Sequence, residues 1–243
     1  MGAKHGEGEM THSQDVAQLV AWIDDTIGER EWVAPDGYPS SLALCVLDSV
    51  WSLGVHYNSV VNVISKYRSL RAAAGANAET DGASELVGTF SEIGDAVAVA
   101  ERLGNRQRTS STNGVLKAQA VRDVAELLVA HDCETASDLV ELSKNAERSA
   151  ELKKAWRKIT GQSSGLSLTY CRMLAGAPDA KADRMVVAFV EEALEADDGT
   201  GDSADRRVSQ EEARRLVTAA AEQRGEDTTD LDHMIWRFQS GRV

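Results

Sequence analysis

A carboxylate stands where the sequence predicts that a helix begins, at Asp183. Gly176 and Pro178 end the preceding helix, because glycine favours helix termination and proline blocks continuation. The next helix is expected to begin around Ala182, with Asp183 in its first turn. A carboxylate there commonly caps backbone N–H groups. It can also stabilise a cationic sugar and activate an attacking water, as in glycosidic bond cleavage. Asp183 is therefore a candidate catalytic residue.

The residues before Asp183 predict two helices joined by a tight turn. The first helix ends near Thr160, the turn runs from Gly161 to Gly165, and the second helix stops at Gly176. The N–H groups that open the second helix would attract a phosphate, although the same pattern also fits a simple corner between helices. The candidate phosphate-binding residues are Gly161, Ser163, Ser164, Gly165, Lys154, Arg157, Lys158 and Arg172.

The charge of the chain is uneven. The formal net charge is −13, yet residues 144–184 carry nine basic and four acidic residues, a net charge of +5. This basic segment contains the predicted turn. Basic residues near a phosphate site add affinity that does not depend on nucleic-acid sequence, although an ordinary solvated helix face would also explain them. The polar loop 104–114, which contains Arg106 and Arg108, is a second candidate for backbone contacts.

Five residues earlier in the chain are candidates for a pocket that receives a base, or for a side chain inserted into DNA. Stacking side chains could come from Trp51, His56, Tyr57 and Tyr170. Trp51 lies in an apolar helix and fits a core position better. Asp48 lies in the same apolar helix, where a buried carboxylate needs a partner or a raised pKa. A satisfied core hydrogen bond is the favoured interpretation of Asp48, and assistance to catalysis is the alternative.

Composition favours an all-α fold. The chain has 243 residues, 42% of them hydrophobic, and only three prolines. No apolar run approaches the ~20 residues of a membrane helix. Residues 1–13 lack the apolar core of a secretory signal and are expected to be disordered. The three cysteines stand singly, which fits packing in a reducing cytosol and excludes the usual zinc and iron–sulfur spacings. We expect a cytoplasmic monomer that does not contact membranes.

Apolar periodicity predicts helices along most of the chain. Residues 42–53 are apolar around most of the helix circumference, so this helix should be central and buried. Two shorter helices are expected at about residues 83–93 and 95–103. Helix N-caps are predicted at Ser13, at Asn58 or Ser59, at Thr135 and at Ser209.

The segment from Ile159 to Asp183 resembles the core motif of the helix-hairpin-helix DNA glycosylases, the endonuclease III-like superfamily. The family motif is a Leu-Pro-Gly-x-Gly turn, a helix rich in Ala and Leu, Gly-x-Pro, and Val-Asp-Thr-His-Val. This chain has Ile-Thr-Gly161, Gly176-x-Pro178 and Asp183, with no gap between the first turn glycine and the aspartate. The resemblance extends over about residues 14–196. Upstream it rests on Lys117-Ala118 and on the apolar helix after Pro39.

The resemblance implies an all-α protein of two helical domains that binds double-stranded DNA, flips a nucleotide and cleaves its N-glycosidic bond. One domain would combine residues 14–37 with 176–243, and the other would span 38–175. Asp183 would be the essential carboxylate. The turn would hold a phosphate, together with a monovalent cation on the carbonyls of residues 159–165, and no other cofactor is implied.

Three departures from the motif narrow this hypothesis. Ser163 replaces the second turn glycine, and Arg184-Met185 replaces Thr-His. Gly165 stands where bifunctional members carry a catalytic lysine, so lyase chemistry through a Schiff base is not expected. The sequence therefore predicts a monofunctional DNA N-glycosylase. The alternative is a catalytically inactive DNA-binding protein with the same fold, and a helical interaction protein that does not touch DNA is a weaker third possibility.

Overall fold

The computed structural model describes residues 3–28, 36–195 and 207–241. All regular elements in this part of the chain are helices, and its only extended pairing is an isolated antiparallel bridge between Arg108 and Leu116. The all-α prediction is confirmed. None of the described helices combines the length and the hydropathy that a membrane span requires.

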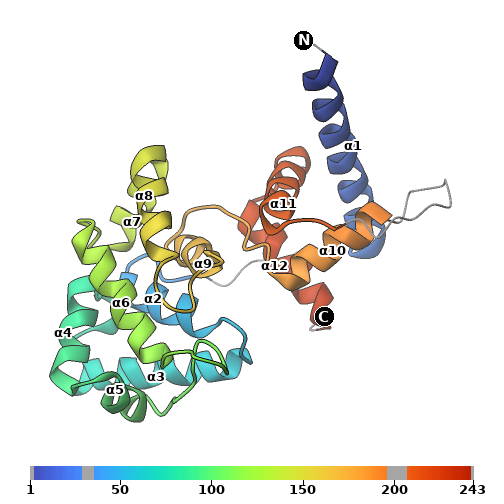
Figure 1. Cartoon of the computed structure of the whole chain (residues 1–243). Helices are drawn as coiled ribbons and strands as arrows, with labels where there is room; N and C mark the ends of the chain where they lie inside the picture. Colours follow the sequence, from blue (N-terminus) through green and yellow to red (C-terminus); the bar gives the residue numbers. More distant parts are fainter. Residues whose placement is uncertain (1–2, 29–35, 196–206, 242–243) are drawn as a thin grey trace. The chain divides into compact units, whose positions relative to one another are not determined.

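The chain forms two compact units, each with its own hydrophobic core (Figure 1). The central unit is Asp36–Ala177, and the terminal unit combines Met1–Pro35 with Pro178–Val243. The sequence predicts the divisions after residues 37 and 175, and the structure places them after 35 and 177. The candidate turn therefore belongs to the central unit and Asp183 to the terminal unit.

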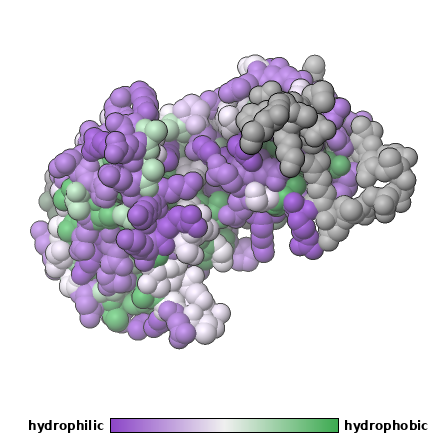
Figure 2. All heavy atoms as spheres, turned by 45° about the horizontal axis from the view of Figure 1, so that its top comes forward, coloured by the Kyte–Doolittle hydropathy of each residue, from purple (hydrophilic) through white to green (hydrophobic). Residues whose placement is uncertain are grey.

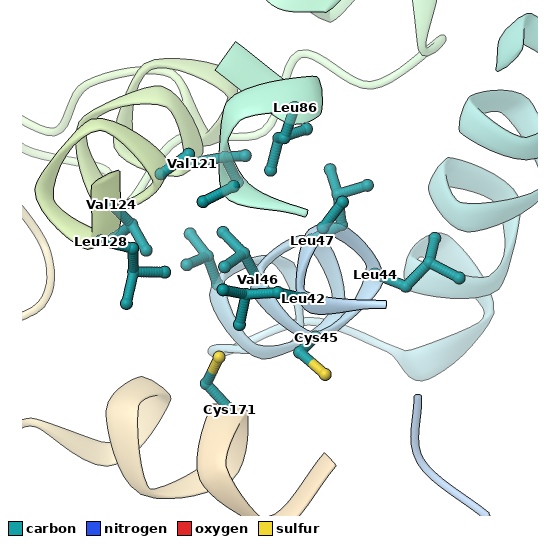
Figure 3. Close-up of a cluster of buried hydrophobic side chains, with 14 of the residues drawn as sticks. Leu42, Leu44, Cys45, Val46, Leu47, Leu86, Val121, Val124, Leu128 and Cys171 are labelled. Atoms are coloured by element: carbon teal, nitrogen blue, oxygen red, sulfur yellow. The ribbon is translucent and has the colours of Figure 1, made fainter. Parts of the chain in front are cut away.

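The central unit is built around one buried helix. All ten residues of α2 (Leu42–Trp51) are buried, as its apolar circumference predicts. Figure 3 shows its side chains packed against Leu86, Leu128 and Cys171 of three other helices. The remaining elements are α3 (Tyr57–Ala73), the short 3-10 helix η1 (Ala78–Thr80), α4 (Ala83–Ile93), α5 (Ala96–Arg102), α6 (Lys117–Ala130), α7 (Ala136–Lys144), α8 (Ala146–Trp156) and α9 (Leu166–Leu174).

Both ends of α2 are capped by side chains. At its start, the Ser41 hydroxyl accepts the Leu44 N–H at 3.3 Å. At its end, the ammonium of Lys117 donates to the carbonyls of Trp51 at 2.7 Å and Leu53 at 2.6 Å. Lys117 is buried, so these carbonyls replace the water that its charge loses on folding. Lys117 thereby fixes the start of the segment that joins α2 to α3.

The terminal unit packs the two ends of the chain together. Its helices are α1 (Ala3–Thr26), α10 (Arg184–Glu195), α11 (Gln210–Arg224) and α12 (Thr228–Gln239). Helix α1 contacts α10 and α11, and α12 contacts the same two helices. The helix α1 already begins at Ala3, so the prediction of disorder through residue 13 is wrong for the described residues. The C-terminal half of α1 is packed against other helices, so the helix is already nucleated there. Adding further turns at its N-terminal end needs no new nucleation, even though residues 3–13 are mostly polar.

Apolar side chains are mostly buried in both units. Among the described residues, Val61 and Val97 are the exposed large hydrophobic side chains. Figure 2 shows that hydrophilic residues dominate the face in view. Large exposed apolar patches often mark protein-binding surfaces. Chemistry and charge are therefore better guides to function here than surface hydrophobicity.

Candidate functional site

The predicted turn between α8 and α9 is formed by two left-handed glycines. Gly161 has φ of 85° and Gly165 has φ of 80°, values that side chains disfavour. The turn closes through two backbone bonds, from Gln162 N–H to Ile159 O and from Gly165 N–H to Gln162 O, both 3.0 Å. Gly165 is the N-cap of α9 and supplies no side-chain oxygen. The Ser164 hydroxyl instead accepts the Leu166 N–H at 3.3 Å, so one of the N–H groups that an anion would bind at the start of α9 already has a side-chain partner.

Buried polar side chains connect the turn to the two helices on either side of it. The Trp156 ring N–H donates to the Ser167 hydroxyl at 2.9 Å, and that hydroxyl donates to Gln162 Oε1 at 2.5 Å. All three residues are buried. This chain connects α8, the turn and α9 inside the central unit, so the turn is pre-organised rather than loosely attached.

The polar loop 104–114 lies against the turn. A Cβ atom on Gly161 would come within 2.3 Å of the Thr109 Cβ, so only glycine fits beside the loop. The loop is closed by the Arg108 guanidinium, which donates to the Gly114 carbonyl at 2.6 Å, and by the Thr109 N–H bond to Val115 O at 2.9 Å. The sequence presents the loop and the turn as separate candidates, and the structure joins them into one polar surface.

The basic candidates divide into an exposed group and a buried one. Lys154 and Lys158 are exposed next to the turn. Arg157 is also exposed, and its Nε donates to the Ser163 carbonyl at 2.6 Å, across the turn. Arg172 is half-buried, and its guanidinium donates to the Ser149 hydroxyl at 2.9 Å. The exposed cations can therefore meet a phosphate, whereas Arg172 is engaged between α9 and α8.

Asp183 is the N-cap of α10. Its Oδ1 accepts the N–H groups of Met185 at 2.8 Å and Val186 at 3.4 Å. The helix itself begins at Arg184, one position after Asp183. Asp183 is half-buried, and its second oxygen, Oδ2, has no hydrogen-bond partner among the described residues. One oxygen anchors the side chain, and the other is available for chemistry.

Two further carboxylates, which the sequence did not single out, lie near Asp183 in the terminal unit. The Asp179 carboxylate accepts two hydrogen bonds from Arg214, from Nε at 2.5 Å and from Nη2 at 3.0 Å. Asp232 of α12 is buried, and it accepts a hydrogen bond from the Lys181 backbone. Burial raises the pKa of Asp232 to about 7, the Lys181 charge opposes this, and the Asp183 charge adds to it. The apolar neighbours of Asp232 in Leu231-Asp-His-Met-Ile235 were the available signal for its burial.

A family model described as "Domain of unknown function (DUF8548)" matches residues 17–240. The chain belongs to this family. No curated protein and no solved structure matches the chain. The matched range of the DUF8548 model includes both the turn and Asp183, so one family unit contains both candidate sites.

This DUF8548 protein also has a buried carboxylate among tyrosines in its central unit. Asp48 Oδ2 accepts the hydroxyls of Tyr38 and Tyr57, each at 3.0 Å, and Tyr170 hydrogen-bonds Tyr57. Burial and the negative charge of Asp48 raise the pKa of all three phenols. One oxygen of Asp48 is thus hydrogen-bonded inside the fold, in keeping with the core role favoured from the sequence, and Tyr38 is the partner that the sequence did not single out.

The other pocket candidates differ in their exposure to solvent. Trp51 is fully buried in α2, which confirms the core prediction. His56 is exposed at the N-cap position of α3. The half-buried rings of Tyr57 and Tyr170 are therefore the described aromatic candidates best suited to stack on a base.

The cysteines and acidic groups of the described residues do not form a metal site. Cys45, Cys133 and Cys171 are buried thiols without disulfides. Burial raises the pKa of Cys133 and of Cys171 to about 12, so these thiols stay protonated and unreactive. No group of three or more His, Cys, Asp or Glu side chains in the described part of the chain is arranged to hold a metal.

Proposed function

We propose that this DUF8548 protein is a monofunctional DNA N-glycosylase of the helix-hairpin-helix type. The resemblance of residues 159–183 to the family motif suggests this function. The observation that carries this proposal is the hydrogen bonding of the Asp183 carboxylate. One carboxylate oxygen is anchored by the N–H groups of α10, and the other has no hydrogen-bond partner among the described residues. A carboxylate held in this way has a fixed orientation and a free oxygen for a cationic sugar or an attacking water.

The turn supports binding to a DNA backbone. Gly161 and Gly165 shape the turn through positive φ angles, Ser163 and Ser164 are exposed on it, and Lys154 and Lys158 are exposed beside it. Duplex DNA is bound without sequence preference through such phosphate contacts. The Ile159 and Gln162 carbonyls, which accept backbone bonds within the turn, are among those that would coordinate a monovalent cation.

The proposed reaction uses water rather than a protein amine. Gly165 stands at the position of the lyase lysine, so no amine is available there for a Schiff base. Asp183 would stabilise the positive charge that develops on the sugar as the base leaves, and it would orient the water that attacks the sugar carbon. The product is an intact strand with an abasic site.

A catalytically inactive DNA-binding protein is the second candidate. Two sequence departures favour it, Ser163 in the turn and Arg184-Met185 after the aspartate. Capping α10 is in itself a sufficient structural role for Asp183. This candidate retains the turn surface and its affinity for duplex DNA, and it predicts no base release.

Base release from duplexes that carry a panel of damaged or modified bases tests the enzymatic proposal. Asp183→Asn should reduce release by about 100-fold or more, because asparagine caps the helix but carries no charge. Asp95→Asn is the matched control, since Asp95 caps α5 by the same two-bond geometry in the central unit. Equal activity of the wild type and Asp183→Asn on every substrate would reject the proposal. Duplex binding without any base release by the wild type would favour the second candidate.

Salt-dependent binding tests the turn surface in both candidates. Removing Lys154 and Lys158 together should weaken duplex binding and lower the slope of log Kd against log salt by about 2. Lys66→Ala with Arg102→Ala removes the same charge from exposed positions on α3 and α5 and should leave the slope unchanged. Identical slopes for the two double variants would show that the turn is not part of the DNA-binding surface.

The contact between Gly161 and the loop 104–114 gives a further prediction. Gly161→Ala should lower the free energy of unfolding by about 2 kcal/mol, from the positive φ and the collision with Thr109. It should also weaken duplex binding. Gly75→Ala is the control, because Gly75 has φ of 72° but open space around its Cβ position. Equal unfolding free energies for the two variants, from urea denaturation, would show that the loop does not constrain the turn.

A further inference from the structure

A surface groove lies between α1 and α11 of the terminal unit. Its volume is about 270 Å³, just below the roughly 300 Å³ at which pockets for drug-sized ligands begin, so its ligand must be small. The groove is lined by His12 of α1 and by Arg214, Arg215, Thr218, Ala219 and Glu222 of α11. Ala219 is the one apolar member of this set. The groove therefore suits an ionic ligand better than an apolar one.

The two walls of the groove are fixed by contacts elsewhere along the same helices. Leu19 and Ile23 of α1 belong to the same buried cluster as Leu216 of α11. The Arg224 guanidinium of α11 also forms an ion pair with the Asp24 carboxylate of α1. A ligand in the groove thus meets walls that are already ordered, and its binding costs little further conformational entropy.

The two arginines of the groove differ in their partners. Arg214 donates to the Asp179 carboxylate at 2.5 and 3.0 Å. Arg215 is exposed and has no hydrogen-bond or ion-pair partner among the described residues. The His12 ring and the Thr218 hydroxyl likewise have no such partner in the described part of the chain. The charge of Arg214 is therefore neutralised within the fold, whereas Arg215 keeps a charge that an external anion can meet.

We propose that this groove binds a phosphate group. The planar guanidinium of Arg215 offers paired N–H donors whose spacing matches that of phosphate oxygens. Thr218 lies three residues further on, on the same face of α11, and His12 adds a donor from α1. Glu211 is already engaged in an ion pair, and Glu222 lies about 10 Å further along the helix axis than Arg215. The Arg215 end of the groove is therefore the end that receives the phosphate.

Titration of the isotope-labelled full chain with inorganic pyrophosphate at constant ionic strength, followed by nuclear magnetic resonance, tests the groove. Saturable shifts are expected for the backbone amides of residues 215–218 and for the His12 ring. Arg215→Gln together with Thr218→Val should weaken binding by about 10-fold or more, because the charge-assisted donors are lost. Arg102→Gln removes one exposed charge from α5 of the central unit and should leave the affinity unchanged.

The phosphate group has two possible sources, a small phosphorylated molecule and the DNA backbone. Duplex binding by the double variant distinguishes them. A slope of log Kd against log salt that is lower by about 1 than in the wild type assigns the groove to a backbone phosphate. An unchanged slope, combined with weakened pyrophosphate binding, assigns the groove to a small phosphorylated molecule.

The proposal is overturned if the duplex slope is unchanged and pyrophosphate produces either no saturable shifts at these residues or equal affinity in the wild type and the double variant. Arg215 is exposed, so Arg215→Gln alone retains the fold and repeats the test if the double variant unfolds. The groove lies outside the proposed function. Absence of base release from every duplex would reject the glycosylase, and the pyrophosphate titration would still decide whether the groove binds phosphate.

Discussion

Asp81 of the central unit and Asp232 of the terminal unit are both buried, but they have different hydrogen-bond partners. In the central unit, Asp81 accepts the Arg71 guanidinium through two bonds, of 2.6 and 2.9 Å, and the Tyr67 hydroxyl at 2.8 Å. In the terminal unit, Asp232 is buried to a similar degree but has a backbone N–H from Lys181 and an oxygen without a partner. Burial alone therefore does not mark a functional carboxylate. The donors around it decide whether it is a fixed ion or a group that holds a proton.

Removing the cation from the central unit should have the largest effect. Arg71→Met should lower the free energy of unfolding by about 3–5 kcal/mol, because it leaves the buried Asp81 charge without its main partner. Arg68→Met is the control, since the Arg68–Glu79 pair is about half-exposed and such pairs contribute about 1 kcal/mol or less. Urea denaturation measures both. Equal losses would remove the distinction between buried and exposed ion pairs in this unit.

The buried acid of the terminal unit should instead make stability depend on pH. The pKa of Asp232 is raised to about 7 in the folded chain, so the folded state keeps a proton that the unfolded chain releases near pH 4. Its contribution to stability is fully present below about pH 4 and is lost as the pH rises to about 7.

Asp232→Asn should remove this dependence. Relative to the wild type, the variant should gain on the order of 2–4 kcal/mol in unfolding free energy between pH 4 and pH 8. Urea denaturation of both proteins across that range measures the gain. A constant difference between the variant and the wild type would show that Asp232 ionises normally.

The smallest effect is expected at the tyrosines of the central unit. Tyr57→Phe should lower the unfolding free energy by about 1–2 kcal/mol, because Asp48 keeps its bond from Tyr38. In the background of Asp48→Asn the same change should cost less, since the charge-assisted bond is already absent. Equal costs in the two backgrounds would mean that Tyr57 stabilises the fold through packing rather than through Asp48.

Local signals in the sequence predicted much of the helical structure. The helix expected at about 83–93 is α4, and Thr135 caps α7 by accepting the Asp138 N–H. Ser209 likewise caps α11 through the Glu212 N–H. These features depend on residues three or four positions apart, whose geometry follows from the helix itself.

Other local predictions were overridden by tertiary contacts. The N-cap predicted at Asn58 or Ser59 is wrong, because α3 begins at Tyr57 after His56. The Tyr57 hydroxyl is held by Asp48 of α2, and this contact fixes Tyr57 at the start of the helix. A side-chain contact between helices here outweighs the capping preference of two polar residues.

The sequence by itself determined the helical class, the glycine turn between α8 and α9, and the position of Asp183 at the start of a helix, because these features depend on near neighbours in the chain. Only the tertiary structure decided that Thr109 lies against Gly161, that two tyrosine hydroxyls donate to Asp48, and that Asp232 lies beside the segment of Asp183. Each of these contacts joins residues far apart in sequence. Their pairing depends on how the packed helices exclude water, which no local pattern records.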